Sequence, residues 1–377
     1  MINQEKFLNC LKQEGIEFIT GIPDTLLNDF CLYVEEKWSK NHHIIAANEG
    51  NAIALAAGFY LATKTIPLVY LQNSGLGNIV NPFLSLTDKD VYGIPMVLLI
   101  GWRGEPDLLD HIQHQKQGAL TPTLLNDMDI PFKILEHNID DAVNKLKWAK
   151  RTSEEINSAV ALIVKKGILA NGKKESFNNN GSKLMFREEA IKKVLEFLPE
   201  NAVYVGSTGR TSRELYESRN IRNEGHEKDF LNVGAMGHTS SIAHGIWAGT
   251  KNRLVVCIEG DSSALMHLGS FATTGIIKKK NFLHIVLNNG VHESVGGQQS
   301  AGILIDFTGI AQNSGYNTVG SAVKTVEDLE RAIHTLALQN GPGFIEIKIK
   351  KGMRTGMPCL KLDFKKSKQN FMKNLME

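Results

Sequence analysis

The sequence has little of what marks membrane, exported or nucleic-acid-binding proteins. No apolar run approaches the roughly 18 residues that span a bilayer, and the N-terminus opens on the polar residues 3–6. Its 42 basic and 40 acidic residues give a net charge of +2, with only residues 348–373 locally basic, which is typical of a solvated surface. The four cysteines lack the paired spacing of zinc or redox sites. We therefore expect a cytoplasmic protein with reduced thiols that binds neither nucleic acid nor membrane.

What the sequence does contain is strand and helix patterns in alternation. At 377 residues and 42% hydrophobic content, the chain is long enough for two domains with real cores. The patterns predict, for example, a strand over 159–164 and helices over 187–197 and 239–249, and this alternation favours doubly wound parallel sheets. Residues 165–185 are rich in Lys, Asn, Gly and Ser. We predict an α/β fold with domains at 1–168 and 186–377, a linker at 169–185 and no middle domain.

One stretch, residues 254–293, carries the strongest site signal. Its pattern predicts a strand over 254–258, a turn containing Asp261, a helix over 264–277, and a second strand over 282–287 that leads into Asn289. Ligands bind at the carboxyl edge of such sheets, and the oxygens of Asp261 and Asn289 suit Mg²⁺ or Ca²⁺. The helix start favours an anion such as a diphosphate. A capping acid and an Asn-Gly turn are the structural alternative.

Two acidic residues follow strands in the N-terminal half. Asp24 lies in a turn after a predicted strand, where it is either catalytic or a helix N-cap for Thr25 onward. Glu49 lies between a predicted strand and a helix of small residues. It is either a paired buried acid or an exposed acid favoured by the helix macrodipole.

Several polar loops follow other predicted strands. They contain Asn73, then Arg103, then Ser207 with Thr208, and finally Met236, Gly237 and His238. The last loop suggests an anion near a helix start or simply a glycine-rich turn. Residues 110–118, with His114 and Lys116, lack helical amphipathicity and are either a surface loop or a loop that anchors an anionic substrate.

With these residues in view, the chain resembles the thiamine diphosphate-dependent 2-keto acid decarboxylases. Gly260-Asp261-Ser262, 25 intervening residues and Asn288-Asn289 match the cofactor motif of that family, except that Ser262 stands where glycine is usual. A serine would be strained there if the position needs a positive φ. The resemblance is closest to the branch that acts on phosphonopyruvate or sulfopyruvate. The segments that carry it are GIPDTLL, NEGNAIALAAGFYLAT, YLQNSGLGNIVNP, YGIPMVLLIGWRGEP, QHQKQG, TGRTSRELYE, NVGAMGHTSSIAHG and NNGVHESVGGQ.

The resemblance implies roles for particular residues. Asp261, the side chain of Asn289 and the carbonyl of Val291 would hold Mg²⁺, Met236 would keep the cofactor bent, and Glu49 would hydrogen-bond N1′ of its aminopyrimidine. Glu49, Asp24 and His114 are the candidate catalytic residues, and Arg103, Lys116 and Arg354 the candidate substrate-binding ones. The expected cofactor-binding set is Glu49, Asn73, Ser207, Thr208, Met236, Gly237, His238, Gly260, Asp261, Ser262, Ser263 and Asn289.

The resemblance also implies an activity and an assembly. We expect thiamine diphosphate- and Mg-dependent decarboxylation of 3-phosphonopyruvate to phosphonoacetaldehyde and carbon dioxide, as in phosphonate biosynthesis. The alternatives are a sulfopyruvate decarboxylase, another 2-keto acid decarboxylase, an acetolactate synthase-like enzyme or a non-catalytic subunit. An acetolactate synthase would be expected to carry a middle domain and a flavin site. We expect a homodimer or homotetramer with active sites between chains.

Overall fold

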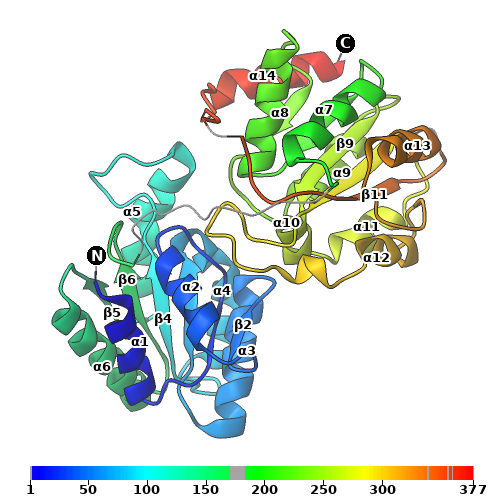
Figure 1. The fold of residues 1–377 in the computed structure, drawn as a ribbon. Coiled ribbons are helices and arrows are strands. Elements are labelled where there is room, and N and C mark those ends of the chain that lie inside the picture. Colours follow the sequence, from blue (N-terminus) through cyan, green and yellow to red (C-terminus); the bar gives the residue numbers. More distant parts are fainter. Residues whose placement is uncertain (1, 170–182, 338, 355, 359, 377) are drawn as a thin grey trace. The chain divides into compact units, whose positions relative to one another are not determined.

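The computed structural model describes residues 2–169, 183–337, 339–354, 356–358 and 360–376. The chain forms two compact units, Met1–Glu175 with Ser294–Gln298, and Ser176–Glu293 with Gln299–Glu377 (Figure 1). Most of the linker predicted at 169–185 lies outside the described residues, so the domain boundaries at 168 and 186 stay a prediction.

The first unit is built on a six-stranded parallel sheet with the strand order β2-β1-β3-β4-β6-β5. Leu68 and Tyr70 of β3 pack into one core and Val69 and Leu71 into another, so both faces are buried, as parallel sheets require. Its elements are α1 Gln4–Gln13, β1 Ile19–Gly21, α2 Asn28–Lys37, β2 His43–Ile45, α3 Glu49–Thr63, β3 Leu68–Gln72, η1 Asn73–Gly75, α4 Leu76–Pro82, η2 Phe83–Thr87, β4 Met96–Gly101, α5 Ile112–Asp127, β5 Phe132–Leu135, α6 Ile139–Ile156 and β6 Ala159–Val164.

The second unit is built on a five-stranded parallel sheet with the strand order β11-β10-β9-β7-β8. Alternate residues of β9 again face two cores, Val256 with Ile258 and Val255 with Cys257. Its elements are α7 Arg187–Phe197, β7 Val203–Gly206, α8 Arg210–Ile221, β8 Asp229–Leu231, α9 Thr239–Gly249, β9 Val255–Gly260, α10 Asp261–Met266, α11 Ser270–Gly275, β10 Phe282–Asn288, η3 Ala301–Ile303, α12 Phe307–Asn313, α13 Val326–Leu336, β11 Gly343–Lys348 and α14 Phe364–Met376. The predicted fold class, two doubly wound parallel-sheet domains, is confirmed.

Three local predictions are wrong. The helix expected over 264–277 is two short helices, α10 and α11, interrupted at His267, whose backbone leaves the helical region. Residues 112–118 belong to helix α5 rather than a loop; most of that helix is solvent-exposed, so its sequence needs little amphipathicity. Asp24 does not cap a helix, because α2 begins at Asn28 with Leu27 as its N-cap.

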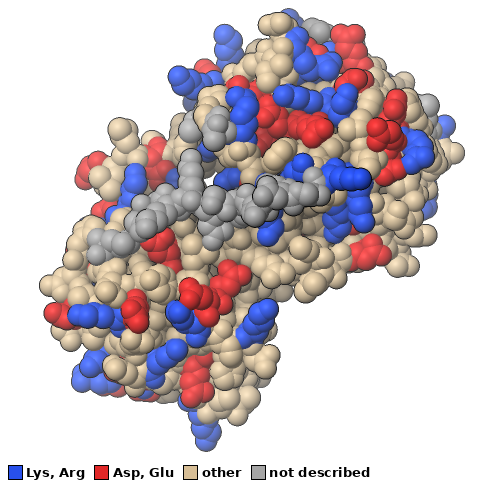
Figure 2. Space-filling view, viewed as in Figure 1, with Lys and Arg blue, Asp and Glu red and all other residues tan. Residues whose placement is uncertain are grey.

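Hydropathy, surface charge and cysteine environment are visible in the structure. Among the described residues, no helix is both long and apolar enough to cross a bilayer. Acidic and basic side chains are interspersed over the visible face (Figure 2). Cys10, Cys31 and Cys257 are buried free thiols, and Cys359 lies outside the described residues.

Candidate active site

Asp261 and Asn289 lie just beyond the ends of two neighbouring strands. Strands β9 and β10 pair in parallel, with Leu287 opposite Gly260, so both side chains emerge at the same edge of the sheet. The prediction that these two strands are adjacent is therefore confirmed. The reason is simple: two consecutive apolar runs joined by a helical segment form a right-handed parallel pair.

Asp261 is a buried carboxylate that suits a bound cation. It is only 2% exposed, accepts a hydrogen bond from Ser300 Oγ, and packs so tightly against Gly302 that a Cβ there would lie 2.5 Å from its Oδ2. Burial raises the pKa of Asp261 to about 6, although the bond from Ser300 opposes the shift. No lysine, arginine or histidine in the described part of the chain forms an ion pair with it. A divalent metal would supply the missing positive charge.

Ser262 occupies the position where the family usually has glycine, and it does so without strain. It lies in α10 and is not among the described residues with positive φ, so the backbone tolerates a side chain. Its hydroxyl is buried and has no hydrogen-bond partner among the described groups. An unpaired buried hydroxyl beside Asp261 fits a site that receives a polar ligand.

Asn289 is held by residues that sequence reasoning missed. Its Nδ2 donates to Glu293 Oε2 at 2.7 Å, and its Oδ1 accepts from the N–H of Val291 at 3.1 Å. Glu293 in turn accepts hydrogen bonds from Arg187 and Arg210, which are the first residues of α7 and α8. The sequence does place an arginine at the start of each of these helices, where the macrodipole disfavours a cation. Such arginines were the available signal that an acidic partner lies nearby.

The other predicted cofactor loops follow the neighbouring strands β7 and β8. Ser207 is buried and Thr208 half-buried after β7, while the loop with Met236 leads from β8 into α9. Gly237 has φ +86°, and its N–H donates to Ser263 Oγ at 3.3 Å. This bond joins the Met236 loop to α10, so both segments lie at the same edge of the sheet.

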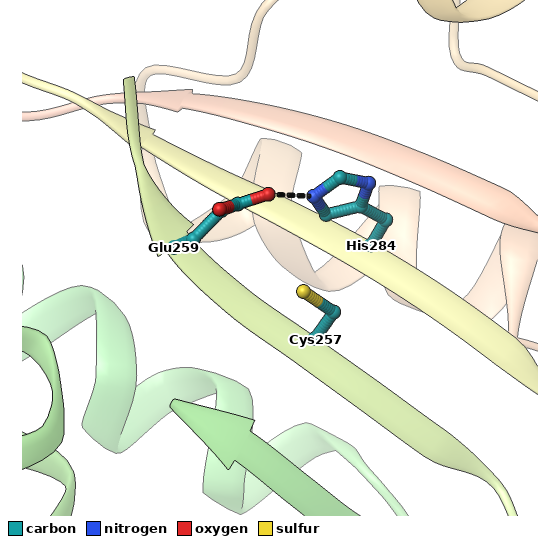
Figure 3. A group of neighbouring side chains, drawn as sticks. All are labelled: Cys257, Glu259 and His284. Carbon is teal, nitrogen blue, oxygen red and sulfur yellow. Dashed lines mark hydrogen bonds and ion pairs between the residues drawn. The ribbon is translucent and has the colours of Figure 1, made fainter. Parts of the chain in front are cut away.

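A cluster of three side chains that the sequence did not suggest lies inside the second unit. The side chains of Cys257, Glu259 and His284 converge from β9 and β10 (Figure 3), with their ligand atoms within 4.8 Å of one another. Glu259 Oε1 is 2.8 Å from His284 Nε2, and its Oε2 accepts from Ser263 Oγ at 2.7 Å. Both carboxylate oxygens are thus occupied, and burial holds the pKa of the Cys257 thiol well above its usual range. A structural zinc site needs four ligands and thiolate cysteines, so we interpret the group as a buried hydrogen-bonded pair beside a neutral thiol.

Glu49 is the first residue of α3 in the first unit. It is 6% exposed, and its Oε2 accepts from Asn78 Nδ2 at 2.7 Å. Gly75 lies against it, so that a Cβ at that position would be 2.5 Å from Glu49 Cδ and 2.6 Å from its Cγ. The sequence interpretation of Glu49 as a buried, paired acid therefore holds, and Asn78 and Gly75 are the neighbours it did not identify.

Asp24, Asn73 and Arg103 lie together at the carboxyl ends of β1, β3 and β4. Asp24 is fully buried, accepts from Gln72 Nε2 and the N–H of Leu26, and has a pKa raised by burial. Asn73 donates to the Arg103 carbonyl at 2.8 Å and accepts from the Arg103 N–H at 3.0 Å. The Asn73 amide therefore ties two strand ends together.

The candidate substrate-binding cations differ in their exposure and in whether they already form an ion pair. Arg103 donates to Asp110 from Nε at 2.7 Å and from Nη2 at 2.5 Å, so its charge is already paired. Lys116 is exposed on α5, and Arg354 is exposed with its Nε 3.2 Å from Glu188. His114 is half-buried on α5, and burial lowers its pKa to about 4.

Comparison with known proteins identifies the class. Residues 3–125 match the thiamine pyrophosphate enzyme N-terminal TPP binding domain, and residues 205–347 match the C-terminal TPP binding domain. The two units are therefore the domains of a thiamine pyrophosphate enzyme.

Curated relatives narrow that class further. The chain is 30% identical to phosphonopyruvate decarboxylase of Streptomyces viridochromogenes, over 95% of this chain and 91% of the relative. It is 30% identical to the enzyme of that name from Streptomyces hygroscopicus, over 93% and 88%. A sulfopyruvate decarboxylase of Methanosarcina acetivorans is 26% identical over 99% and 97%. The chain belongs to the thiamine diphosphate-dependent decarboxylases.

Proposed function

We propose that the protein decarboxylates 3-phosphonopyruvate to phosphonoacetaldehyde and carbon dioxide. The observation that carries the proposal is its 30% identity with two phosphonopyruvate decarboxylases over nearly the whole chain. A sulfonate in place of the phosphonate is the second candidate, because a sulfopyruvate decarboxylase matches 99% of the chain at lower identity.

We propose that Asp261, Asn289 and the Val291 carbonyl hold Mg²⁺ and, through it, the cofactor diphosphate. The support is chemical: these are hard oxygen ligands, and Asp261 is a buried carboxylate with no cation partner among the described residues. The loop residues Ser207, Thr208, Met236, Gly237 and His238 and the α10 residues Ser262 and Ser263 would line the same cofactor.

Glu49 is the proposed residue for proton movement. Bound thiamine diphosphate would supply the electron sink for loss of carbon dioxide from the keto acid. Glu49 would share a proton with N1′ of the aminopyrimidine. Burial shields this carboxylate from water, and Asn78 fixes its orientation through Oε2. Asp24 and His114 remain proposed catalytic residues.

We propose that the distal anion of the substrate is recognised by three cationic side chains, Arg103, Lys116 and Arg354. Each charge-assisted hydrogen bond contributes about 1.5–3 kcal/mol, so two of them would favour a dianionic substrate over a neutral analogue by about two or more orders of magnitude. For Arg103, the substrate would have to compete with Asp110 for the guanidinium.

The experiment is a side-by-side measurement of kcat/KM for phosphonopyruvate, sulfopyruvate and pyruvate with Mg²⁺ and thiamine diphosphate. We expect kcat/KM for phosphonopyruvate to exceed that for pyruvate by at least about 100-fold, which is the factor that two charge-assisted hydrogen bonds provide. Lys116→Ala or Arg354→Ala should reduce this ratio of kcat/KM values. A larger kcat/KM for sulfopyruvate would assign the second candidate. Equal kcat/KM values for phosphonopyruvate and pyruvate would refute the phosphonopyruvate proposal, and equal values for all three substrates would refute both candidates. Light scattering would test the proposed homodimer or homotetramer with active sites between chains.

A further inference from the structure

Glu293 is a buried carboxylate that joins two helix starts to the loop after β10. It is 7% exposed, and its carboxylate accepts hydrogen bonds from Arg187 Nη2, Arg210 Nη1 and Asn289 Nδ2. Arg210 also donates from Nη2 to the Glu293 backbone carbonyl at 2.8 Å. Four hydrogen bonds thus fix both the side chain and the backbone of this residue.

The two arginines stand where a cation is electrostatically unfavourable. Arg187 begins α7 and Arg210 begins α8, where the positive end of the helix macrodipole opposes a cation. Arg187 is also only 5% exposed, which adds a desolvation cost. Pairing with Glu293, and for Arg187 also with Glu214 at 3.4 Å, offsets both costs. The Glu293 carboxylate is therefore the group on which the two arginines converge.

The carboxylate decides which way the amide of Asn289 faces. An ionised carboxylate only accepts hydrogen bonds, so only the NH₂ group of Asn289 can point toward it. The amide oxygen must then point the other way, where it accepts from the Val291 N–H and keeps a second lone pair. That oxygen is the atom proposed to bind the metal.

We propose that Glu293, held by Arg187 and Arg210, is a positioning residue that fixes the metal-binding oxygen of Asn289. This inference rests on the proposed metal role of Asn289. Partners of this kind orient the ligands of a metal, and their loss typically weakens metal affinity about 10–100-fold. Neither arginine nor Glu293 needs to touch the metal or the cofactor for this role.

The test compares Glu293→Gln with Asn289→Ala. Thiamine diphosphate binding is followed by quenching of tryptophan fluorescence while Mg²⁺ is varied. A glutamine can turn its own NH₂ toward the Asn289 oxygen, so the amide loses its fixed orientation. We expect Glu293→Gln to need about 10–100-fold more Mg²⁺ for half-maximal cofactor binding, with kcat recovering at saturating Mg²⁺. A merely structural defect would lower kcat at every Mg²⁺ concentration.

Asp229→Asn is the matched control. It breaks another buried ion pair of the same unit, in which Arg219 Nη2 lies 3.0 Å from Asp229 Oδ1 at the start of β8. We expect it to lower the melting temperature without changing the Mg²⁺ requirement. An unchanged requirement in Asn289→Ala would refute the metal site itself. A shifted requirement in Asn289→Ala but not in Glu293→Gln would overturn only the role of Glu293.

If Glu293→Gln does not fold, Arg210→Gln decides the question. This side chain is half-buried, and its replacement leaves Arg187 and Glu293 paired. We expect a severalfold higher Mg²⁺ requirement, smaller than that of Glu293→Gln. A Mg²⁺ requirement equal to that of the wild type would overturn the proposal.

Discussion

Replacing Gly75 by alanine tests the role of Glu49 without changing Glu49. A Cβ at position 75 would lie 2.5 Å from Glu49 Cδ, whereas carbon atoms pack at about 3.5–4.0 Å. The carboxylate must therefore move by about 1 Å. A displacement of that size can cost about 100-fold in rate, or about 2.7 kcal/mol. The φ of Gly75 is not positive, so the alanine adds no backbone strain of its own.

The assay is exchange of the C2 proton of bound thiamine diphosphate with deuterium, followed by NMR after acid quench. We expect Gly75→Ala to slow exchange about 100-fold while overpacking costs about 1–3 kcal/mol of folding free energy. Gly77→Ala is the control, because nothing lies within 4 Å of a Cβ there. In a Glu49→Ala background, Gly75→Ala should add no further loss, since the clashing atoms are gone.

The refuting result is equally definite. If folded Gly75→Ala, with its Glu49 carboxylate shown to be displaced, exchanges the C2 proton at the wild-type rate, the position of that carboxylate does not control proton transfer. A further loss in the Glu49→Ala background would show instead that Gly75→Ala acts through the surrounding loop.

Three other changes have expected outcomes. Asp261→Ala should abolish retention of thiamine diphosphate through dialysis with Mg²⁺, measured by the cofactor released on denaturation; full retention would refute the metal site. Gly237→Ala should destabilise the protein by about 1–3 kcal/mol in urea, because φ is +86° and a Cβ would lie 2.7 Å from Met266 Cβ. Glu214 is a buried residue of α8 whose Oε1 lies 3.4 Å from Arg187 Nη1. Burial raises its pKa from 4.5 to about 7, so its contribution to stability is full below pH 4.5 and is lost as pH rises through 7. Glu214→Gln should remove this decrease, about 3 kcal/mol between pH 4.5 and 8, from the pH dependence of urea unfolding; an unchanged profile would contradict the assignment.

Local patterns in the sequence determined much of the fold. The predicted strand over 159–164 and helices over 187–197 and 239–249 have the bounds found in the structure. Hydrophobic periodicity and turn residues act over a few neighbouring residues, so they can be recognised directly in the sequence. The same reasoning made β9 and β10 adjacent and so brought Asp261 and Asn289 to one edge of the sheet.

Only the tertiary structure decided what surrounds these residues. The bonds from Arg187 and Arg210 to Glu293 join positions 106 and 83 residues apart, and that from Gln72 to Asp24 spans 48. No periodic pattern encodes such contacts, because they depend on which helix starts and strand ends meet once the sheet has formed. Helix α5 was missed for a different reason: most of it is solvent-exposed, so its sequence carries little amphipathic pattern. The sequence thus determined which candidate ligands lie at the sheet edge, and the packed chain decided which groups hold them there.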